Sequence, residues 1–402
     1  MFDETKESLL ERIYPEFPSA EYESRYETAQ KAMEKEGLDA LIVTKKNTEY
    51  FTGCMTTIGP KLGIIPRDQN PVLLIPAFLS GTAERTSWVR NIVRHTEAHL
   101  KHEKMSFAKL VVNTLTKMGL DNGTIGLEQG EDLESSLHFA EVEYLRKKLP
   151  NTDFVPGGDV LWACRMRKSS REIERLRTAA SIAMKGYNTA RDQLDLGMTE
   201  IEIAEVFKEV LIEEQTKEGH NTNSIGYFNI RAGSERYPMA DTFNQDRPIQ
   251  DGDVLVMNVG AWFRRYYANW SRYAYVGQPP NKFKKAHEAI VQAIGIFQDN
   301  LEPGAVSKEI HDKAIKPLKD CDCGETFDHT GIGVGLHIHE PPYIGHGRED
   351  VVDPDNVFCF QAWIYDVDND GMGVLGYEHE FVVTESGCKP IVPMEDELLW
   401  II

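Results

Sequence analysis

The chain has 402 residues, of which 41% are hydrophobic and 27% are charged, and its formal net charge of -20 gives a pI near 5.1. This acidic balance excludes nucleic acid as the main partner, because binding to phosphates requires a basic surface. No apolar run reaches the length of about 18 residues that crosses a bilayer, and the N-terminus lacks the apolar segment of a secretory signal, so we expect a cytoplasmic protein without membrane contact.

Helical and strand-like patterns alternate through the first part of the chain. Apolar residues recur at helical spacing over 21–35, and Gly37 separates them from an apolar, β-branched run over 40–44. This alternation predicts an α/β domain over residues 1–160. Its other expected elements are helices over 6–13, 105–118 and 131–148, and strands over 71–76 and 124–127.

Residues 161–402 predict a second α/β domain. A long amphipathic helix begins after Ser169 or Ser170, and Glu172 is placed to complete a capping box with the N-cap residue. The other expected elements are a strand or connector over 162–167, strands over 224–231 and 253–276, and helices over 199–213, 281–300 and 306–318, the first of them with a capping box from Thr199 to Glu202.

The most informative stretch covers residues 251–276, with the sequence DGDVLVMNVGAWFRRYYANWSRYAYV. Its two β-rich runs predict a hairpin that reverses near residues 264–265. Asn258 and Asn269 fall near the middle of the two strands. A polar side chain in a buried sheet is costly unless something holds it, so we expect both asparagines to face one pocket.

Three segments carry a family resemblance because they occur in the same order and spacing as in the family. They are DGDVLVMNVG in the hairpin, GVGLHIHEPPYI and EHEFVVTESG. Together they resemble the pita-bread superfamily, which includes creatinase, prolidase and aminopeptidase P. The run EGLDALIVTKKNTEYFTGC also resembles the creatinase N-terminal domain. The resemblance implies an α/β chain with a creatinase-like N-terminal domain followed by a pita-bread domain.

The family positions that hold two metal ions are almost all changed in this chain. The resemblance places Asn258, Asn269, Ile332, Gln361 and Glu378 at these positions, where the family has two aspartates, a histidine and two glutamates. Divalent ions are held by anionic oxygens and imidazole, so neutral amides and an alkyl chain predict no metal and no other cofactor. An active metallo-aminopeptidase would need His329 as a replacement ligand, which would still not restore the carboxylates.

The candidate catalytic residues are His339, His337 and Glu378. The resemblance implies that His339 faces the substrate, where an imidazole can bind a carbonyl or transfer a proton. On a strand, His337 would point the same way and act as a second base, or it would lie on the rim. A buried Glu378 without a metal would act as an acid or base, bind a cation, or form an ordinary ion pair with an arginine.

The candidate substrate-binding residues surround the same positions. Asn258, Asn269 and Gln361 are expected to orient the substrate or a water, with Ile332 beside them. Three further candidates are Trp262 for an aromatic surface, Asp241 as a loop carboxylate or substitute base, and Arg231 as a clamp for a substrate carboxylate.

These residues lead to one functional hypothesis and two alternatives. The first is a metal-independent hydrolase of a C–N bond in a small polar metabolite, similar to creatinase or ectoine hydrolase. The second is a lyase for a sulfonium or betaine compound such as dimethylsulfoniopropionate. The third is a non-catalytic pita-bread binding protein. The family resemblance also implies a homodimer, and the expected partner is otherwise a small molecule.

Overall fold

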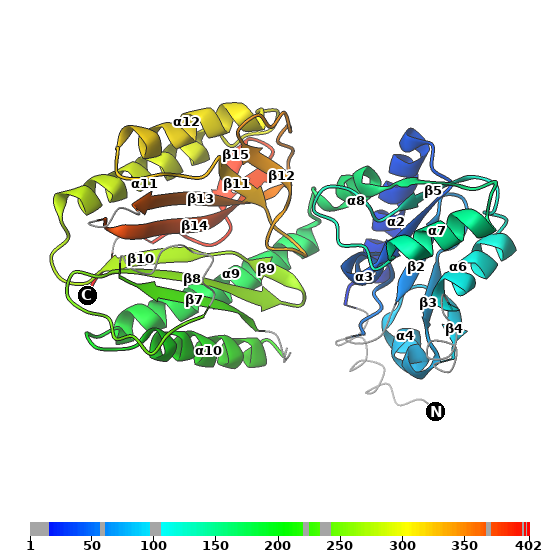
Figure 1. Ribbon diagram of the computed structural model, residues 1–402, viewed down its shortest axis with the longest axis horizontal. Helices are drawn as coiled ribbons and strands as arrows, with labels where there is room; N and C mark the ends of the chain where they lie inside the picture. The colour runs from blue at the N-terminus through cyan, green and yellow to red at the C-terminus, as the bar shows by residue number, and fades with distance from the viewer. Residues whose placement is uncertain are drawn as a thin grey trace. The chain divides into compact units, whose positions relative to one another are not determined.

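The structure is a computed structural model that describes residues 16–56, 61–96, 106–219, 225–233, 243–366, 371–395, 398 and 400–402. The chain divides into two compact units, Met1–Arg165 and Met166–Ile402 (Figure 1). The helix predicted over 6–13 lies outside the described residues. Among the described residues, no helix is long and apolar enough to cross a membrane.

The N-terminal unit is built on a six-stranded sheet with the strand order β4-β3-β2-β1-β5-β6. Strands β1, β2 and β3 pair in antiparallel fashion, while β3–β4, β1–β5 and β5–β6 are parallel. The elements are α2 (Ser19–Glu36), β1 (Ala40–Thr44), α3 (Lys45–Thr52), β2 (Leu62–Pro66), β3 (Val72–Pro76), a 3-10 turn (Ala77–Leu79), α4 (Ser80–Thr86), β4 (Asn91–His95), α6 (Ser106–Lys117), β5 (Thr124–Leu127), α7 (Phe139–Lys148), β6 (Asp153–Pro156) and α8 (Gly158–Arg165).

Two predicted elements of this unit are wrong. The helix expected over 131–148 begins only at Phe139, because His138 and Glu141 form a capping box there. The strand or connector expected over 162–167 is instead helix α8, which ends at Arg165 and is largely buried. A short apolar run of this kind does not distinguish a strand from a buried helix by its periodicity.

The C-terminal unit is built on a ten-stranded sheet whose main path has the order β12-β11-β13-β14-β10-β8-β7. The elements are α9 (Ser170–Gln193), α10 (Glu200–Lys217), β7 (Gly226–Ala232), β8 (Val254–Phe263), β9 (Tyr266–Ala268), β10 (Ser271–Tyr275), α11 (Asn281–Asn300), α12 (Ser307–Asp320), β11 (His329–Gly333), β12 (Glu340–Gly345), β13 (Val357–Asp366), β14 (Gly373–Thr384), β15 (Gly387–Pro390) and β16 (Trp400–Ile401).

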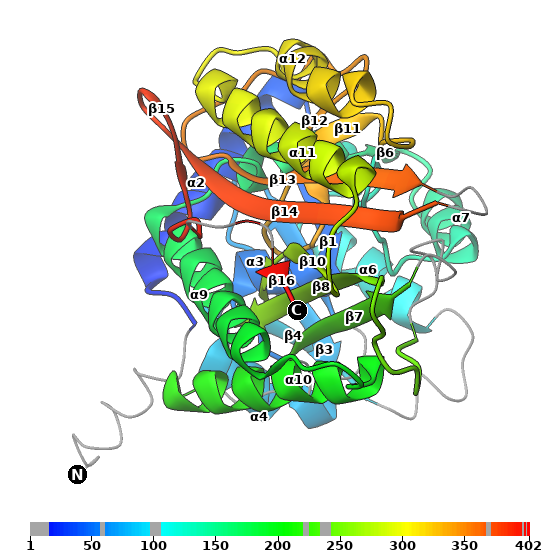
Figure 2. The ribbon, with the colours of Figure 1, turned by 90° about the vertical axis from the view of Figure 1, so that its left-hand side faces the viewer.

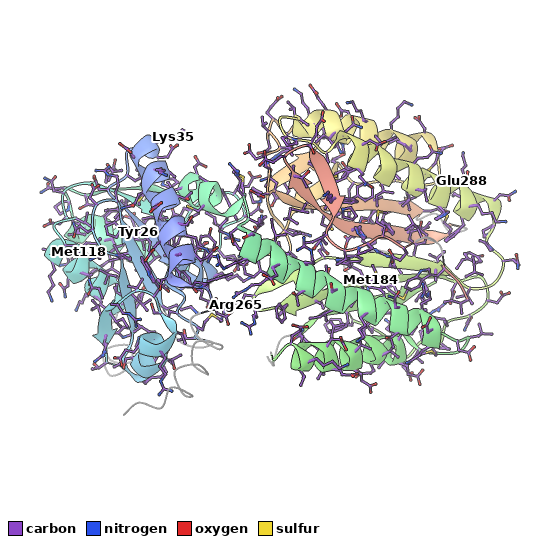
Figure 3. All side chains as sticks on the ribbon, turned by 180° about the vertical axis from the view of Figure 1, so that it is seen from behind. Tyr26, Lys35, Met118, Met184, Arg265 and Glu288 are labelled. Atoms are coloured by element: carbon purple, nitrogen blue, oxygen red, sulfur yellow. The ribbon has the colours of Figure 1, made fainter. Side chains whose placement is uncertain are left out.

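Two helix pairs cover this sheet. Helices α9 and α10 pack against β8 and β7, and α11 and α12 pack against β13, β11 and β12, so that the strands lie between the pairs (Figure 2). Helices α9 and α11 present polar side chains such as Glu288 to solvent (Figure 3). Both predicted capping boxes are confirmed, with Ser169 and Thr199 as N-caps.

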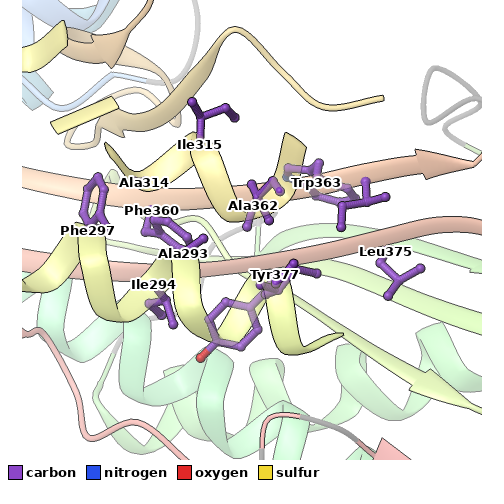
Figure 4. Packing of buried hydrophobic residues seen from close by; sticks show 14 of the residues in the cluster. Ala293, Ile294, Phe297, Ala314, Ile315, Phe360, Ala362, Trp363, Leu375 and Tyr377 are labelled. Atoms are coloured by element: carbon purple, nitrogen blue, oxygen red, sulfur yellow. The ribbon is translucent and has the colours of Figure 1, made fainter. Parts of the chain in front are cut away.

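An extended apolar cluster of this unit lies between α11, α12 and the strands β13 and β14. Phe297 of α11 packs on Phe360 with ring centroids 4.9 Å apart, and Ala314 and Ile315 of α12 belong to the same cluster (Figure 4). Burial of such side chains contributes roughly 25 cal/mol per Å² of apolar surface. This packing holds β13 and β14 in place on one face, and polar side chains such as Gln361 and Glu378 lie on the opposite face.

The predicted hairpin is present, with one change in its second strand. Residues 264–265 form the turn, and both have positive φ, of 45° and 76°. The return is split into β9 and β10, and Asn269 lies in the break between them rather than within a strand. Asn258 lies in the middle of β8, as expected.

Candidate functional site

A row of polar side chains crosses five adjacent strands of the C-terminal sheet. Gln361 on β13 lies opposite Glu378 on β14, which lies opposite Ser271 on β10. Ser271 in turn lies opposite Asn258 on β8, and Asn258 lies opposite Asn229 on β7. Residues directly opposite in antiparallel strands point to the same face, so these five side chains form one continuous polar row.

Glu378 is the centre of the polar row and is only 2% exposed. Its Oε1 accepts hydrogen bonds from Gln361 Nε2 at 2.8 Å and from Trp363 Nε1 at 3.1 Å, and its Oε2 accepts one from Asn258 Nδ2 at 3.2 Å. Burial raises the pKa of Glu378 to about 8, although these donors and the charge of Arg272 act in the opposite direction. The carboxyl group is therefore held by neutral donors.

His329 extends the hydrogen bonds of the row beyond Gln361. The distance between His329 Nε2 and Gln361 Oε1 is 2.8 Å, and the ring stacks on Phe327 at a centroid distance of 4.9 Å. Because the amide nitrogen of Gln361 donates to Glu378, its oxygen accepts, so the proton of His329 is on Nε2. Burial lowers the pKa of His329, which favours this neutral form.

Trp363 reaches Glu378 because Gly376 has no side chain. Trp363 on β13 lies opposite Gly376 on β14. A Cβ atom at Gly376 would lie 2.0 Å from the Trp363 ring, which real contacts do not allow. The missing side chain therefore makes room for the indole.

Asn269 lies beside the row and bridges to β14 and β7. Its backbone nitrogen donates to Glu380 Oε1 at 2.7 Å, and its side-chain oxygen accepts a hydrogen bond from the Tyr227 hydroxyl. Glu380 is fully buried, and burial raises its pKa well above the usual value. Asn269 Nδ2, Glu380 Oε2 and Ser271 Oγ are buried and have no hydrogen-bond partner in the described part of the chain.

Of the other predicted site residues, Ile332 and Arg231 are buried in the C-terminal sheet, and Trp262 lies at one end of it. Ile332 on β11 is buried opposite Cys359 of β13, so it shares the face of Gln361. Arg231 on β7 is buried and lies opposite Val256. Trp262 lies near the hairpin turn and packs on Tyr267, away from the row. Asp241 lies outside the described residues.

The prediction that His337 and His339 lie on one strand is wrong. Strand β11 ends at Gly333 and β12 begins at Glu340, so both histidines lie in the bend between these strands. The Glu340 carboxylate accepts a hydrogen bond from His337 N at 3.3 Å and pairs with buried Lys168 at 3.0 Å, which fixes the bend. His339 is exposed, and the hydrogen bonds of Glu378 within the described residues come from other side chains.

Several residues of the site were not singled out by sequence reasoning. His329 was considered only as a replacement metal ligand, and Ser271, Trp363 and Glu380 were not considered as site residues. A usable signal existed for Glu380, since it follows Glu378 by two positions on a strand and therefore points the same way. No comparable signal existed for the pairing of His329 with Gln361, which depends on the register between β11 and β13.

The donor set does not fit the paired divalent ions that the family resemblance implies. The amide nitrogens of Asn258 and Gln361 point at both oxygens of Glu378, where a metal ion would require lone pairs. Ile332 offers no donor atom at all. Among the described residues, no group of three or more His, Cys, Asp or Glu side chains is arranged to hold a metal ion.

A groove of about 420 Å³ follows the outer edge of β7. Tyr227 and Asn229 line it from β7, and Ile201 and Lys208 line it from α10. Asn244 closes the edge of β7 by accepting from Ile230 N and donating to the Phe228 carbonyl, at 2.9 Å each. Tyr227 and Asn229 therefore belong both to the groove and to the surroundings of the polar row.

Comparison with known proteins gives matches over almost the whole chain. Residues 174–385 match metallopeptidase family M24, and residues 25–167 match the creatinase/prolidase N-terminal domain. The Xaa-Pro dipeptidase of Pyrococcus horikoshii is 26% identical over 369 residues, which is 91% of this chain and 96% of that protein. The Xaa-Pro dipeptidase of Pyrococcus furiosus is 26% identical over 93% of this chain and 99% of that protein.

Solved structures support the same fold. Dipeptidase PepE from Mycobacterium ulcerans superimposes with a TM-score of 0.80 at 23% identity, over 96% of this chain and 100% of that one. The predicted superfamily and the α/β fold class, with a creatinase-like N-terminal domain and a pita-bread C-terminal domain, are confirmed.

The predicted activity, in contrast, is wrong. A metal-independent, creatinase-like hydrolase acting on a small polar metabolite would have relatives named for that reaction, whereas these relatives are named Xaa-Pro dipeptidases. The changed residues at the metal positions indicate only that the centre is altered, and they do not indicate creatinase chemistry. The chain belongs to metallopeptidase family M24, with a creatinase/prolidase N-terminal domain in front of the matched region.

Proposed function

We propose that this protein binds short peptides of the Xaa-Pro class at the polar row of its C-terminal sheet, and that it does so without paired divalent ions. The single observation that carries the proposal is the row itself. It keeps hydrogen-bonding side chains at the positions where the family holds metals. Within the described residues, Ser271 Oγ in the row and Asn269 Nδ2 beside it have no hydrogen-bond partner.

The peptide class comes from the relatives. Proteins named Xaa-Pro dipeptidase cover nearly the whole chain, so the ligand they are named for is the first candidate. A dipeptide offers one carbonyl, one carboxylate and one ammonium group, which match unpartnered donors and acceptors of a polar row. The groove along β7 provides a route for the peptide to the polar row, because Tyr227 lines the groove and its hydroxyl also contacts Asn269.

The proposed independence from metal follows from the orientation of two amides. Asn258 and Gln361 neutralise the site by replacing carboxylates that would otherwise repel Glu378 and need a cation between them. With direct hydrogen bonds in place, the side chains hold one another without an ion.

Calorimetric titration of the full chain with Ala-Pro tests this function, with Ala-Gly as the control peptide and with release of free proline followed in the same samples. We expect Ala-Pro to bind equally well in EDTA and in added manganese, and Ser271→Ala to weaken binding while Ser386→Ala, at an exposed turn, leaves it unchanged. Absence of Ala-Pro binding would contradict the proposal. Manganese-dependent binding or proline release would contradict its metal-free part.

We also propose that the protein is a cytoplasmic homodimer. The support is the family resemblance together with the acidic composition, which suits a freely diffusing protein. Light scattering during size-exclusion chromatography measures the assembly directly, and a mass of 45.6 kDa for the eluting species would contradict the dimer.

A further inference from the structure

Two carboxyl groups point to the same face of β14. Glu378 and Glu380 are two residues apart on a continuous strand, so their side chains lie on one side of the sheet. They are 2% and 0% exposed, and β13 places Gln361 and Cys359 opposite them. With Ser271 and Asn269 on the facing chain segment, the two acids form a four-residue cluster that we call the acid corner.

The acid corner has more acids than available cations. Arg272 interacts electrostatically with Glu378, but it is bound by Glu395 through two hydrogen bonds of 2.6 and 2.8 Å. Lys168 interacts electrostatically with Glu380, yet its ammonium group is paired with Glu340 at 3.0 Å. Within the described residues, each neighbouring cation therefore already has its own carboxylate.

The acid corner also contains buried atoms without partners. Ser271 is fully buried, and the register places it between Asn258 and Glu378, yet its Oγ makes no hydrogen bond within the described residues. Glu380 Oε2 and Asn269 Nδ2 are also buried and make no hydrogen bond within the described residues. A buried polar atom without a partner is costly, so three such atoms on neighbouring residues of the acid corner indicate that a ligand group completes them.

The chemistry of these atoms selects the ligand group. Ser271 Oγ and Glu380 Oε2 can accept hydrogen bonds, and a primary ammonium group supplies three donors and one positive charge. An anion brings no donor to these two acceptors, and a divalent ion meets the N–H groups of Asn258 and Gln361 rather than lone pairs.

We propose that the acid corner binds a primary ammonium group, held between Ser271 Oγ and the carboxyl groups of Glu378 and Glu380. Resting on the proposed function, this group is the α-ammonium of the bound peptide. Asn269 Nδ2 then donates to the carbonyl oxygen of the first peptide residue. Glu380 is the residue that sets this preference, because its Oε2 has no hydrogen-bond partner within the described residues, whereas both oxygens of Glu378 already accept hydrogen bonds.

The first test compares Ala-Pro with N-acetyl-Ala-Pro by calorimetry. In the wild-type protein we expect acetylation to weaken binding by about tenfold or more, because it removes a charge-assisted contact. In Glu380→Gln, which keeps the acceptor for Asn269 N, the two peptides should bind within about twofold of each other. Glu385→Gln makes the same chemical change at an exposed turn and should behave as the wild type.

The second test uses methylammonium chloride, with tetramethylammonium chloride at equal ionic strength as the control. Methylammonium should raise the Tm of the wild type and of Glu385→Gln, and it should leave the Tm of Glu380→Gln and Ser271→Ala unchanged. Glu380→Gln exchanges a buried acid for a neutral isostere, so folding is not expected to fail.

The outcomes separate this inference from the proposed function. If both peptides bind the wild type equally, the ammonium site is overturned while peptide binding stands. If neither peptide binds but methylammonium raises the Tm only when Glu380 is present, the site stands and the peptide function fails. If neither peptide binds and methylammonium has no effect, both are overturned.

Discussion

The amide nitrogen of Gln361 donates a 2.8 Å hydrogen bond to Glu378 Oε1 across strands β13 and β14. At this place the family resemblance implies two carboxylates that need a cation between them. In this chain an amide N–H group and a carboxyl oxygen are in direct contact at this place instead.

Gln361→Glu tests the strength of this contact. The substitution exchanges a donor for a second carboxyl group beside a buried one, so we expect the free energy of unfolding to fall by about 3 kcal/mol at pH 7.5. Urea denaturation measures the change. Gln278→Glu, at an exposed position after β10, should stay within about 0.5 kcal/mol of the wild type. Equal stability of the two variants would contradict the hydrogen bond.

Removal of metal should leave the protein unchanged. A divalent ion present at 100 times its dissociation constant stabilises a protein by about 2.7 kcal/mol. Its loss would lower the Tm by roughly 5 °C or more for a domain of this size. We therefore expect dialysis against EDTA to change the Tm by less than about 1 °C. Elemental analysis before dialysis checks whether an ion was present to be removed.

Rebuilding the family's donors supplies the matched control for this experiment. The variant carries Asn258→Asp, Asn269→Asp, Ile332→His and Gln361→Glu together with the native Glu378. Because it places several carboxylates side by side in a buried site, it should be unstable without metal and gain several degrees of Tm in manganese. No response to manganese would show that the strands no longer hold these positions at metal-binding distance.

Gly376→Ala should displace the indole of Trp363. The added Cβ would lie 2.0 Å from the ring, and overpacking of this kind costs about 1–3 kcal/mol. We expect a shift of tryptophan fluorescence as well as lower stability by thermal denaturation. Gly295→Ala, in an open position of α11, should instead stabilise the protein by about 0.5–1 kcal/mol, since alanine favours the helix.

His311 predicts a specific loss of stability in acid. Burial lowers its pKa to about 4 from 6.5, and Lys319, His329 and His346 act in the same direction while Asp312 opposes them. The unfolded chain therefore binds the proton more tightly than the native one. The stabilisation is complete above pH 6.5 and is lost as the pH falls from there to about 4, by on the order of 2 kcal/mol.

His311→Gln removes the titrating group and keeps a polar side chain near Thr330, whose hydroxyl lies 3.3 Å from His311 Nδ1. We expect a flatter stability profile between pH 6.5 and 4 in this variant, measured by urea denaturation at several pH values. His138→Gln, at an exposed N-cap of the N-terminal unit, serves as the control. Parallel profiles for the wild type and His311→Gln would contradict the assignment.

Much of the fold was predictable because periodicity and capping act within short segments. The limits of α11 agree with the sequence pattern, and Ser169 and Thr199 mark the starts of α9 and α10. Helix α8 was mistaken for a strand or connector because its short apolar run fits either structure. Its helical form depends on packing inside the N-terminal unit, where the Tyr50 hydroxyl donates to the Cys164 carbonyl.

The site was predictable only as a set of positions. The motifs identified Asn258, Gln361 and Glu378, and the structure joins these three by hydrogen bonds. The partners His329 and Trp363 were not predictable, because the contact of His329 depends on the register between β11 and β13, and that of Trp363 on the register between β13 and β14. The bend that carries His337 and His339 was missed because the two histidines were expected on one strand.

The Asn258–Glu378 contact joins residues 120 positions apart in the chain. Loop closure over such a distance is slow, so contacts of this kind form late in folding. The hairpin of β8, β9 and β10 can form early, yet it carries only Asn258 and Ser271 of the five-residue polar row until β14 pairs with it. A newly synthesised chain therefore completes the polar row at the end of folding, and an intact row marks completion of the C-terminal unit rather than formation of any single hairpin.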